Sequence, residues 1–341
     1  MSTTVTTAEP ETAGPAEPDH RAERRRAFVD AAVLTALSML LALVVSGVLI
    51  AVADPDVQDA ARYFFSRPTD TLVAVWDAVG SAYAALFQGA IVDVGAGTVT
   101  AAIRPLTESL VFAAPLIAAG LAVGLAFRSG LFNIGAEGQI ILGAVGASYV
   151  GFAWQLPVVV HMVVAVLAAM ALGALWGGIP GVLKARTGAH EVITTIMLNN
   201  IARFLLAFLL STSAFQRPGR NDPISPRVAD SAALPQLLGG WSRLHLGLLL
   251  ALAAAAAVWW LLNRSTLGFK LRAVGANPAA ARTAGIRTGS MTFTAMALAG
   301  GLAGLAGGFQ ILGTEKALTG GISAGIGFDA ITVALLGRGN P

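Results

Sequence analysis

The stretch RSGLFNIGAEGQ, residues 128–139, places polar side chains and glycines between two long apolar runs. It holds the carboxylate of Glu137, the amides of Asn133 and Gln139, and three glycines. Polar groups at membrane depth are energetically unfavourable and are usually functional. Glycines there indicate a broken helix, which is tolerated only against protein or a water-filled cavity. This stretch therefore has the composition expected of a path through a membrane.

The apolar runs around this stretch predict an all-α, polytopic transmembrane bundle. The 341-residue chain is 55% hydrophobic and only 12% charged, whereas soluble domains carry roughly 25% charged residues. Residues 31–53 and 138–183 hold no charge, and Pro157 divides the second run. About 20 apolar residues cross a bilayer core. We expect about eight spans, near residues 31–53, 106–127, 136–154, 157–183, 191–213, 244–263 and 291–313, and from 322 to the chain end.

The segment from Thr71 to Val92 is apolar but contains Asp77 and Gln88. Counting it as a span would invert every later segment and move the basic residues of 264–288 outside, against the positive-inside rule. We therefore interpret it as a helix that lies on the outer face or is partly inserted.

Basic residues predict a cytoplasmic N-terminus. This topology leaves thirteen lysines and arginines inside and eight outside, with Arg203 within a span. The outer segment 214–243 weakens the bias because it holds four arginines. Residues 1–30 are expected to form a disordered cytoplasmic tail, since they begin with an acidic, Pro/Thr-rich stretch. Residues 31–341 are expected to form the transmembrane domain.

Several function classes are excluded by composition. The pI near 9.7 follows from the inner basic residues and does not indicate nucleic-acid binding. The chain has no cysteine, which excludes disulfides, thiolate metal sites and cysteine nucleophiles. Its four histidines lack metal-ligand spacing, and neither a nucleophile elbow nor a Walker sequence occurs. We therefore expect no cofactor, no metal and no enzymatic activity.

Residues 264–290 form an inner loop with the signals of a short helix. Asn277 suits the cap, Pro278 suits the first helical position and Gly285 suits the stop. A helix this short is marginal in water. It therefore needs support from the protein's own surface, from lipid headgroups or from a partner, and the residues alone leave these three alternatives open.

Small residues recur at four-residue spacing in 143–151 and again in 300–308. Such faces let helices approach closely in lipid. They predict a compact helical bundle and do not by themselves indicate a mechanism.

Three segments match the pattern of one protein family. They read FRSGLFNIGAEGQIILGA from Phe127, KARTGAHEVITTIMLNNIA from Lys184 and GFKLRAVGANPAAARTAGI from Gly268. Together they resemble the permease subunits of ABC importers for nucleosides and simple sugars, the branch related to ribose permeases. The resemblance covers roughly residues 106–341. Family members usually continue past the equivalent of LLGRGNP, so the resemblance implies a chain truncated at its C-terminus.

The resemblance implies a multi-pass permease in the plasma membrane, embedded in the lipid bilayer. Two permease subunits, identical or paralogous, would form the pathway for a small-molecule solute. An extracytoplasmic solute-binding lipoprotein would deliver the solute, and a cytoplasmic ABC ATPase subunit would drive an inward–outward switch. The short helix of the inner loop would be the coupling helix that docks into this ATPase. The implied coupling residues are Gly275, Asn277, Pro278, Ala281, Arg282 and Gly285.

Polar residues near or within the spans are expected to line the solute pathway. Amides offer the donors and acceptors that a nucleobase edge or a ribose requires. The candidate residues are Asn133, Glu137, Gln139, Asn199 and Asn200.

Some of these residues have a second interpretation. In the structural alternative, Glu137 does not line the pathway but bonds to backbone groups that Gly135 and Gly138 leave free. Asn199 and Asn200 point about 100° apart on a helix, so one can face the path while the other bonds a neighbouring helix.

Two further charges need local explanations. Glu191 suits the N-terminus of its helix. Arg203 requires a partner or must reach a headgroup, and Glu108 and Glu137 are the candidate partners.

The leading hypothesis is an ABC permease for nucleosides or related ribose-containing solutes. A simple-sugar ABC permease is the alternative within the same class. An ion-coupled secondary carrier that needs no ATPase is the alternative from a different class.

Overall fold

The computed structural model describes residues 20–337, and the chain divides into two units between Phe87 and Gln88. The first unit contains α1 (His20–Ala53), α2 (Pro55–Ala61) and most of α3 (Pro68–Ala90). Asp54 caps α2, since its carboxylate accepts hydrogen bonds from the N–H groups of Asp56 and Val57. The segment expected to form an outer-face helix is indeed helical, as α3.

Helix α1 begins at His20 and not at residue 31, so the end of the expected disordered tail is helical. The first nineteen residues of that tail lie outside the described part of the chain. Within the first unit, the hydroxyl of Tyr83 donates to the carbonyl of Leu43 and joins α3 to α1.

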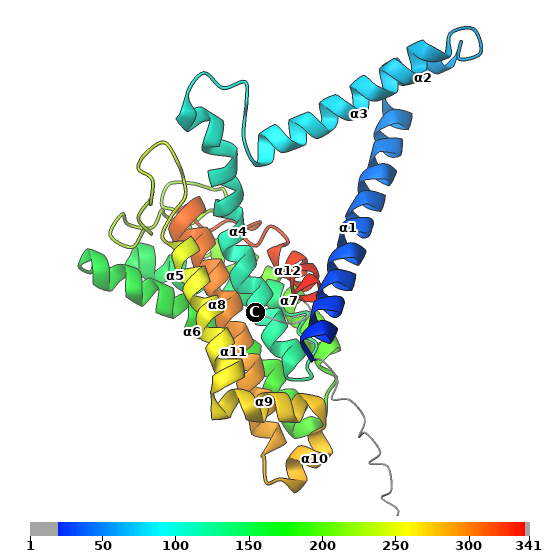
Figure 1. The fold of residues 1–341 in the computed structure, drawn as a ribbon. Coiled ribbons are helices and arrows are strands. Elements are labelled where there is room, and N and C mark those ends of the chain that lie inside the picture. The colour runs from blue at the N-terminus through cyan, green and yellow to red at the C-terminus, as the bar shows by residue number, and fades with distance from the viewer. Residues whose placement is uncertain (1–19, 338–341) are drawn as a thin grey trace, which may run out of the picture. The chain divides into compact units, whose positions relative to one another are not determined.

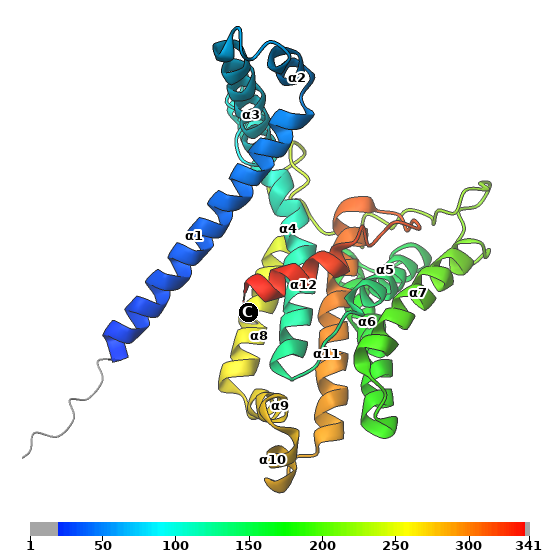
Figure 2. The same ribbon diagram turned by 90° about the vertical axis from the view of Figure 1, so that its right-hand side faces the viewer.

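The second unit is a helical bundle (Figures 1 and 2). Its expected spans correspond to helices, and most bounds lie within a few residues of the predicted ones, except that the helix expected from residue 106 begins at Val99. The elements are α4 (Val99–Arg128), α5 (Ala136–Ala153), α6 (Val158–Thr187), α7 (Glu191–Leu210), α8 (Gly247–Arg264), α9 (Thr266–Ala276), α10 (Pro278–Thr283), α11 (Thr288–Phe309), the π-helix η1 (Gln310–Glu315) and α12 (Ile326–Leu336).

Glycines let α11 pack closely against α5 and α6 at the centre of this bundle. A Cβ on Gly143 of α5 would lie 2.4 Å from the Cα of Gly304, and a Cβ on Gly173 of α6 would lie 2.3 Å from the carbonyl oxygen of Gly300. The close approach predicted for the small-residue faces is therefore confirmed.

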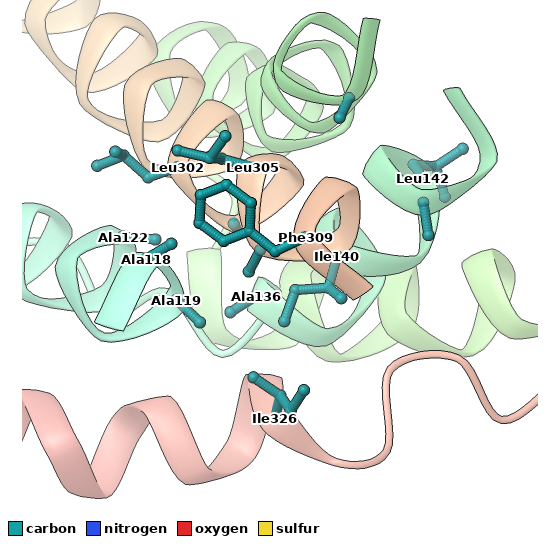
Figure 3. Close-up of a cluster of buried hydrophobic side chains, with 14 of the residues drawn as sticks. Ala118, Ala119, Ala122, Ala136, Ile140, Leu142, Leu302, Leu305, Phe309 and Ile326 are labelled. Atoms are coloured by element: carbon teal, nitrogen blue, oxygen red, sulfur yellow. The ribbon is translucent and has the colours of Figure 1, made fainter. Parts of the chain in front are cut away.

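The apolar core continues from this glycine contact toward the C-terminal end of α11. Phe309 is fully buried at the end of α11, and Figure 3 shows it among leucine, isoleucine and alanine side chains of α4, α5, α11 and α12.

Six helices of the described residues are long and apolar enough to cross a membrane. They are Ala32–Ala53, Val99–Arg128, Val158–Thr187, Glu191–Leu210, Gly247–Arg264 and Thr288–Glu315, the last combining α11 with η1. Helix α12 has 11 residues, and at 1.5 Å per residue it extends only about 16 Å, roughly half of a bilayer core. The expected count of eight spans is therefore not confirmed.

Candidate functional site: the broken helix and the inner hairpin

The stretch between α4 and α5 is held by a pair of amides. The Nδ2 of Asn133 donates to the Oε1 of Gln139 at 3.0 Å, and the Nε2 of Gln139 donates back to the Oδ1 of Asn133 at 3.2 Å. The same Oδ1 accepts from the N–H of Gly135 at 3.0 Å. Both amides are buried, with 0% and 1% exposure. In this arrangement they bind each other and the loop backbone.

Asn199 of α7 joins this loop to α5. Its Oδ1 accepts from the N–H of Gly138 at 2.9 Å, and its Nδ2 donates to the carbonyl of Ile134 at 2.8 Å. One side chain thus satisfies a donor and an acceptor on the two sides of the helix start. The bond to a neighbouring helix, expected of one of the two asparagines, is made by Asn199. Asn200 is exposed and donates to Ile196 of its own helix at 3.3 Å.

Glu137 reaches a segment distant in the sequence. Its Oε2 accepts from the N–H of Gly327, in the first turn of α12, at 2.9 Å. A Cβ at Gly327 would lie 2.3 Å from the backbone nitrogen of Glu137, so only glycine allows this approach. Glu137 therefore braces backbone, as its structural interpretation expected, but the braced backbone belongs to α12 and not to Gly135 or Gly138.

Trp176 of α6 lies against the same junction. A Cβ built on Gly138 would be 3.0 Å from the indole Nε1 and 3.1 Å from the Oδ1 of Asn199. The indole N–H is buried and has no hydrogen-bond partner among residues 20–337. Buried unpaired donors are rare in folded proteins. Its position beside the bonds of Asn199 identifies a polar cluster with one unused donor.

At the N-terminus of α7, the carboxylate of Glu191 pairs with the Nζ of Lys184 at 2.5 Å. Glu191 is the first residue of α7, so it lies at a helix N-terminus, as expected. The two partners considered for Arg203 are occupied elsewhere, since Glu108 pairs with Arg243 and Glu137 bonds Gly327. Arg203 is exposed on α7.

The outward face of α7 combines apolar and polar side chains. It holds Asn200 and Arg203 among exposed hydrophobic residues, some of them more than half exposed. An arginine and an amide on a bilayer-length helix require protein, water or headgroups around them. The exposed hydrophobic residues of this face are Ile193, Ile196, Met197, Ile201, Phe204 and Phe208.

The helix predicted in the inner loop is confirmed as α10. Asn277 caps it by accepting from the N–H groups of Ala279 and Ala280 at 3.0 and 3.1 Å. Pro278 is the first helical residue, and Gly285 follows the end with a φ of +80°. Only Ala281 of this helix is buried, while Arg282 is exposed.

Helices α9 and α10 form a hairpin, and α9 contacts the turn where the broken helix begins. A Cβ on Gly275 would lie 2.6 Å from the carbonyl oxygen of Arg128 and 2.8 Å from the nitrogen of Gly130. Gly130 itself has a φ of +71°, and its own Cβ would lie 2.8 Å from the Cα of Gly275. The two backbones therefore touch without intervening side chains. The order of the motifs did not predict this contact, because their separation along the chain gives no distance.

A family model described as "Branched-chain amino acid transport system / permease component" matches residues 106–341. The chain belongs to this family. The matched region includes the broken helix, α7, the α9–α10 hairpin and α12, and it begins inside α4. The permease is thus a multi-pass membrane protein and a transport component, consistent with its six apolar helices.

Named relatives of the permease transport different solutes. The guanosine ABC transporter permease protein NupP of Bacillus subtilis is 42% identical over 260 residues, which are 76% of this chain and 72% of that protein. The glucose ABC transporter permease protein TsgB13 of Haloferax volcanii is 40% identical over 242 residues, or 68% and 63%. The nucleoside ABC transporter permease protein NupB of Lactococcus lactis is 34% identical over 249 residues, or 70% and 68%. No solved structure matches the chain.

Proposed function

We propose that this permease is the membrane-spanning subunit of an ABC importer for nucleosides or related ribose-containing solutes, driven by a separate ATPase. The observation that carries the proposal is the 42% identity to a guanosine permease across 76% of this chain. A second relative with a nucleoside cargo supports the same class. The glucose permease relative favours the alternative, a simple-sugar importer.

We propose that the solute pathway follows the outward face of α7, against a second permease subunit. Asn200 is the pathway candidate with an amide at the surface. Of the other candidates, Asn133, Gln139 and Asn199 hold the backbone beside this helix, while Glu137 holds α12. Their role is therefore to shape the wall, while Asn200 meets the solute.

We propose that α10 docks into the ATPase and that this end of the bundle is cytoplasmic, as is the N-terminus. Helix α10 has too few residues to be stable by itself, and its exposed surface lacks a covering element within the described part of the chain. The exposed surface near Arg282 then contacts the ATPase. The opposite end of the bundle receives the solute-binding lipoprotein.

Uptake competition tests the cargo. The complete transporter is reconstituted, and uptake of labelled guanosine is measured with excess uridine, adenosine, ribose or glucose. Strong competition by nucleosides supports the proposal. Competition by glucose or ribose alone would replace it with the sugar importer.

Deletion of residues 277–285 tests the coupling role. The shortened permease should no longer copurify with the ATPase, while remaining in the membrane. Unchanged copurification would remove α10 as the docking helix. Uptake driven by an ion gradient without any ATPase would favour the secondary carrier.

Asn200→Ala tests the pathway. The variant should assemble normally and transport less, with a raised KM, because the amide of Asn200 contacts solute. The control is Asn263→Ala, since Asn263 is exposed and bonds only a carbonyl of its own helix, that of Trp259. Equal transport by both variants would exclude Asn200 from the pathway.

A further inference from the structure

We infer that the contact between Gly130 and Gly275 is the joint through which movement of the α9–α10 hairpin reaches α7 and α12. This inference rests on the proposed function, because it assumes that an ATPase moves α10. It assigns a positioning role to two glycines that contact neither the solute nor the nucleotide. Four structural observations carry it.

First, a single residue, Asn277, both ends α9 and caps α10. The N–H of Asn277 donates to the carbonyl of Ala273 and so closes α9, while its side chain caps α10. No flexible linker separates the two helices. A displacement of α10 is therefore transmitted directly to α9.

Second, α9 is held at both ends by backbone contacts. A Cβ on Gly268 would lie 1.9 Å from the carbonyl oxygen of Leu261 at the end of α8. The other end is the Gly275 contact with residues 128–130. Backbone against backbone leaves no side chain that can change rotamer and absorb a shift. Leu271 and Val274 are buried between these two points.

Third, residues 129–131 continue the end of α4 as a tight turn. The N–H groups of Gly130 and Leu131 donate to the carbonyls of Phe127 and Ala126, each at 3.0 Å. Gly130 has a positive φ, which favours glycine over residues with a side chain. Figure 2 shows this turn at the C-terminal end of α4, next to α9.

Fourth, the residues after this turn are bonded to two other helices. Asn199 of α7 holds Ile134 and Gly138, and Glu137 holds Gly327 of α12. A shift of the turn therefore changes the positions of α7, which carries the proposed pathway face, and of α12. Coupling between distant sites requires such a contiguous set of contacts with discrete arrangements.

The first experiment compares Gly275→Ala with a matched control in the reconstituted transporter. The added methyl group of Gly275→Ala would overlap the backbone of the turn. The control is Gly289→Ala, in the first turn of α11, where a Cβ would meet Ala185 at an ordinary 3.5 Å. Copurification of the ATPase, basal ATP hydrolysis and solute uptake are measured for both variants.

Gly275 is among the coupling residues that the resemblance implies, but it packs against residues 128–130 and does not belong to the exposed surface of α10. For Gly275→Ala, copurification and basal hydrolysis should therefore stay within about twofold of wild type, while uptake should fall by about tenfold. Gly289→Ala should leave all three unchanged. Uptake by Gly275→Ala within about twofold of wild type would overturn the inference. Failure of the wild-type transporter to take up solute or bind an ATPase would instead refute the proposed function.

A second measurement decides the matter if Gly275→Ala does not assemble. The chain has no cysteine, so single labels can be introduced cleanly at exposed positions. Spin-label pairs are placed at Ala279→Cys with Phe132→Cys, and at Ala279→Cys with Arg186→Cys at the end of α6. Distances are measured with and without nucleotide in the complete transporter.

The distance from position 279 to position 132 should stay constant, because the joint holds the hairpin and the turn together. The distance from 279 to 186 should change, because the hairpin moves relative to α6. A change in both distances, or in neither, would overturn the inference.

Discussion

The carboxylate of Glu137, in the first turn of α5, accepts a hydrogen bond from the backbone N–H of Gly327 in the first turn of α12. The bond joins residues 190 positions apart in the sequence. It connects the polar stretch after α4 to the last helix described. Substitution of the residues that hold this polar stretch should therefore affect stability, while substitution of exposed residues should affect transport.

Glu137→Ala should lower the thermal stability of the permease in detergent. It leaves the N–H of Gly327 buried without an acceptor, which costs about 1–2 kcal/mol. Glu137→Gln keeps an acceptor oxygen and should unfold between the alanine variant and wild type. An alanine variant as stable as wild type would contradict the bracing role.

Asn199→Ala should destabilise the permease far more than Asn200→Ala does. The first change removes both bonds to Gly138 and Ile134 and should cost about 1–3 kcal/mol. The second removes one bond within an exposed helix face and should stay within about 0.5 kcal/mol. Thermal unfolding of the two variants, which differ by one position on the same helix, measures the difference. Equal losses would argue against the bracing by Asn199.

Trp176→Phe should leave stability unchanged or raise it slightly. The indole N–H is buried without a partner in the described part of the chain, and removing an unpaired polar group relieves its desolvation penalty. Phenylalanine retains much of the apolar contact. A loss of more than about 2 kcal/mol on thermal unfolding would contradict this prediction.

Asn277→Ala should weaken binding to the ATPase with little effect on global stability. The cap bonds to Ala279 and Ala280 stabilise α10 by about 1 kcal/mol, and α10 is almost entirely exposed. Asn277→Asp offers the same acceptor and should restore binding in copurification. Weak binding by both variants would show that the amide itself, and not the cap, is recognised.

His245 should make stability depend on pH in the acidic range. Burial, followed by the charge of Lys316, lowers the pKa of His245 from 6.5 to about 4. Its Nδ1 accepts from the N–H of Gly247 at 3.1 Å, so the neutral form fits the fold. Between pH 6.5 and 4 the unfolded chain binds a proton that the folded chain does not. Stability is therefore complete above pH 6.5 and falls as the pH drops toward 4.

The measurement is the difference in melting temperature between wild type and His245→Asn across pH 7.5 to 4.5. Asparagine offers an acceptor to the same N–H and does not titrate. Wild type should lose stability by up to about 1.4 kcal/mol per pH unit relative to the variant. Parallel curves for the two proteins would exclude a titration of His245 in this window.

The sequence alone determined the features that depend on neighbouring residues and on the solvent. Uncharged runs in 31–53 and 138–183 predicted membrane helices, because a charge in the bilayer core is costly. The cap, first turn and stop of α10 were legible in Asn277, Pro278 and Gly285, because capping chemistry acts over three or four residues. The motifs around these features also identified the family.

Only the tertiary structure decided what the polar residues bond. Glu137 finds Gly327, Asn199 finds Gly138, and Gly130 touches Gly275. Each pair joins segments far apart in the chain, and the choice of partner follows from how the helices pack. Helical periodicity tells which face a residue occupies, but not which helix lies opposite it or how closely two backbones approach. For that reason the sequence predicted a polar break in the membrane, while its role as a bracing centre came from the fold.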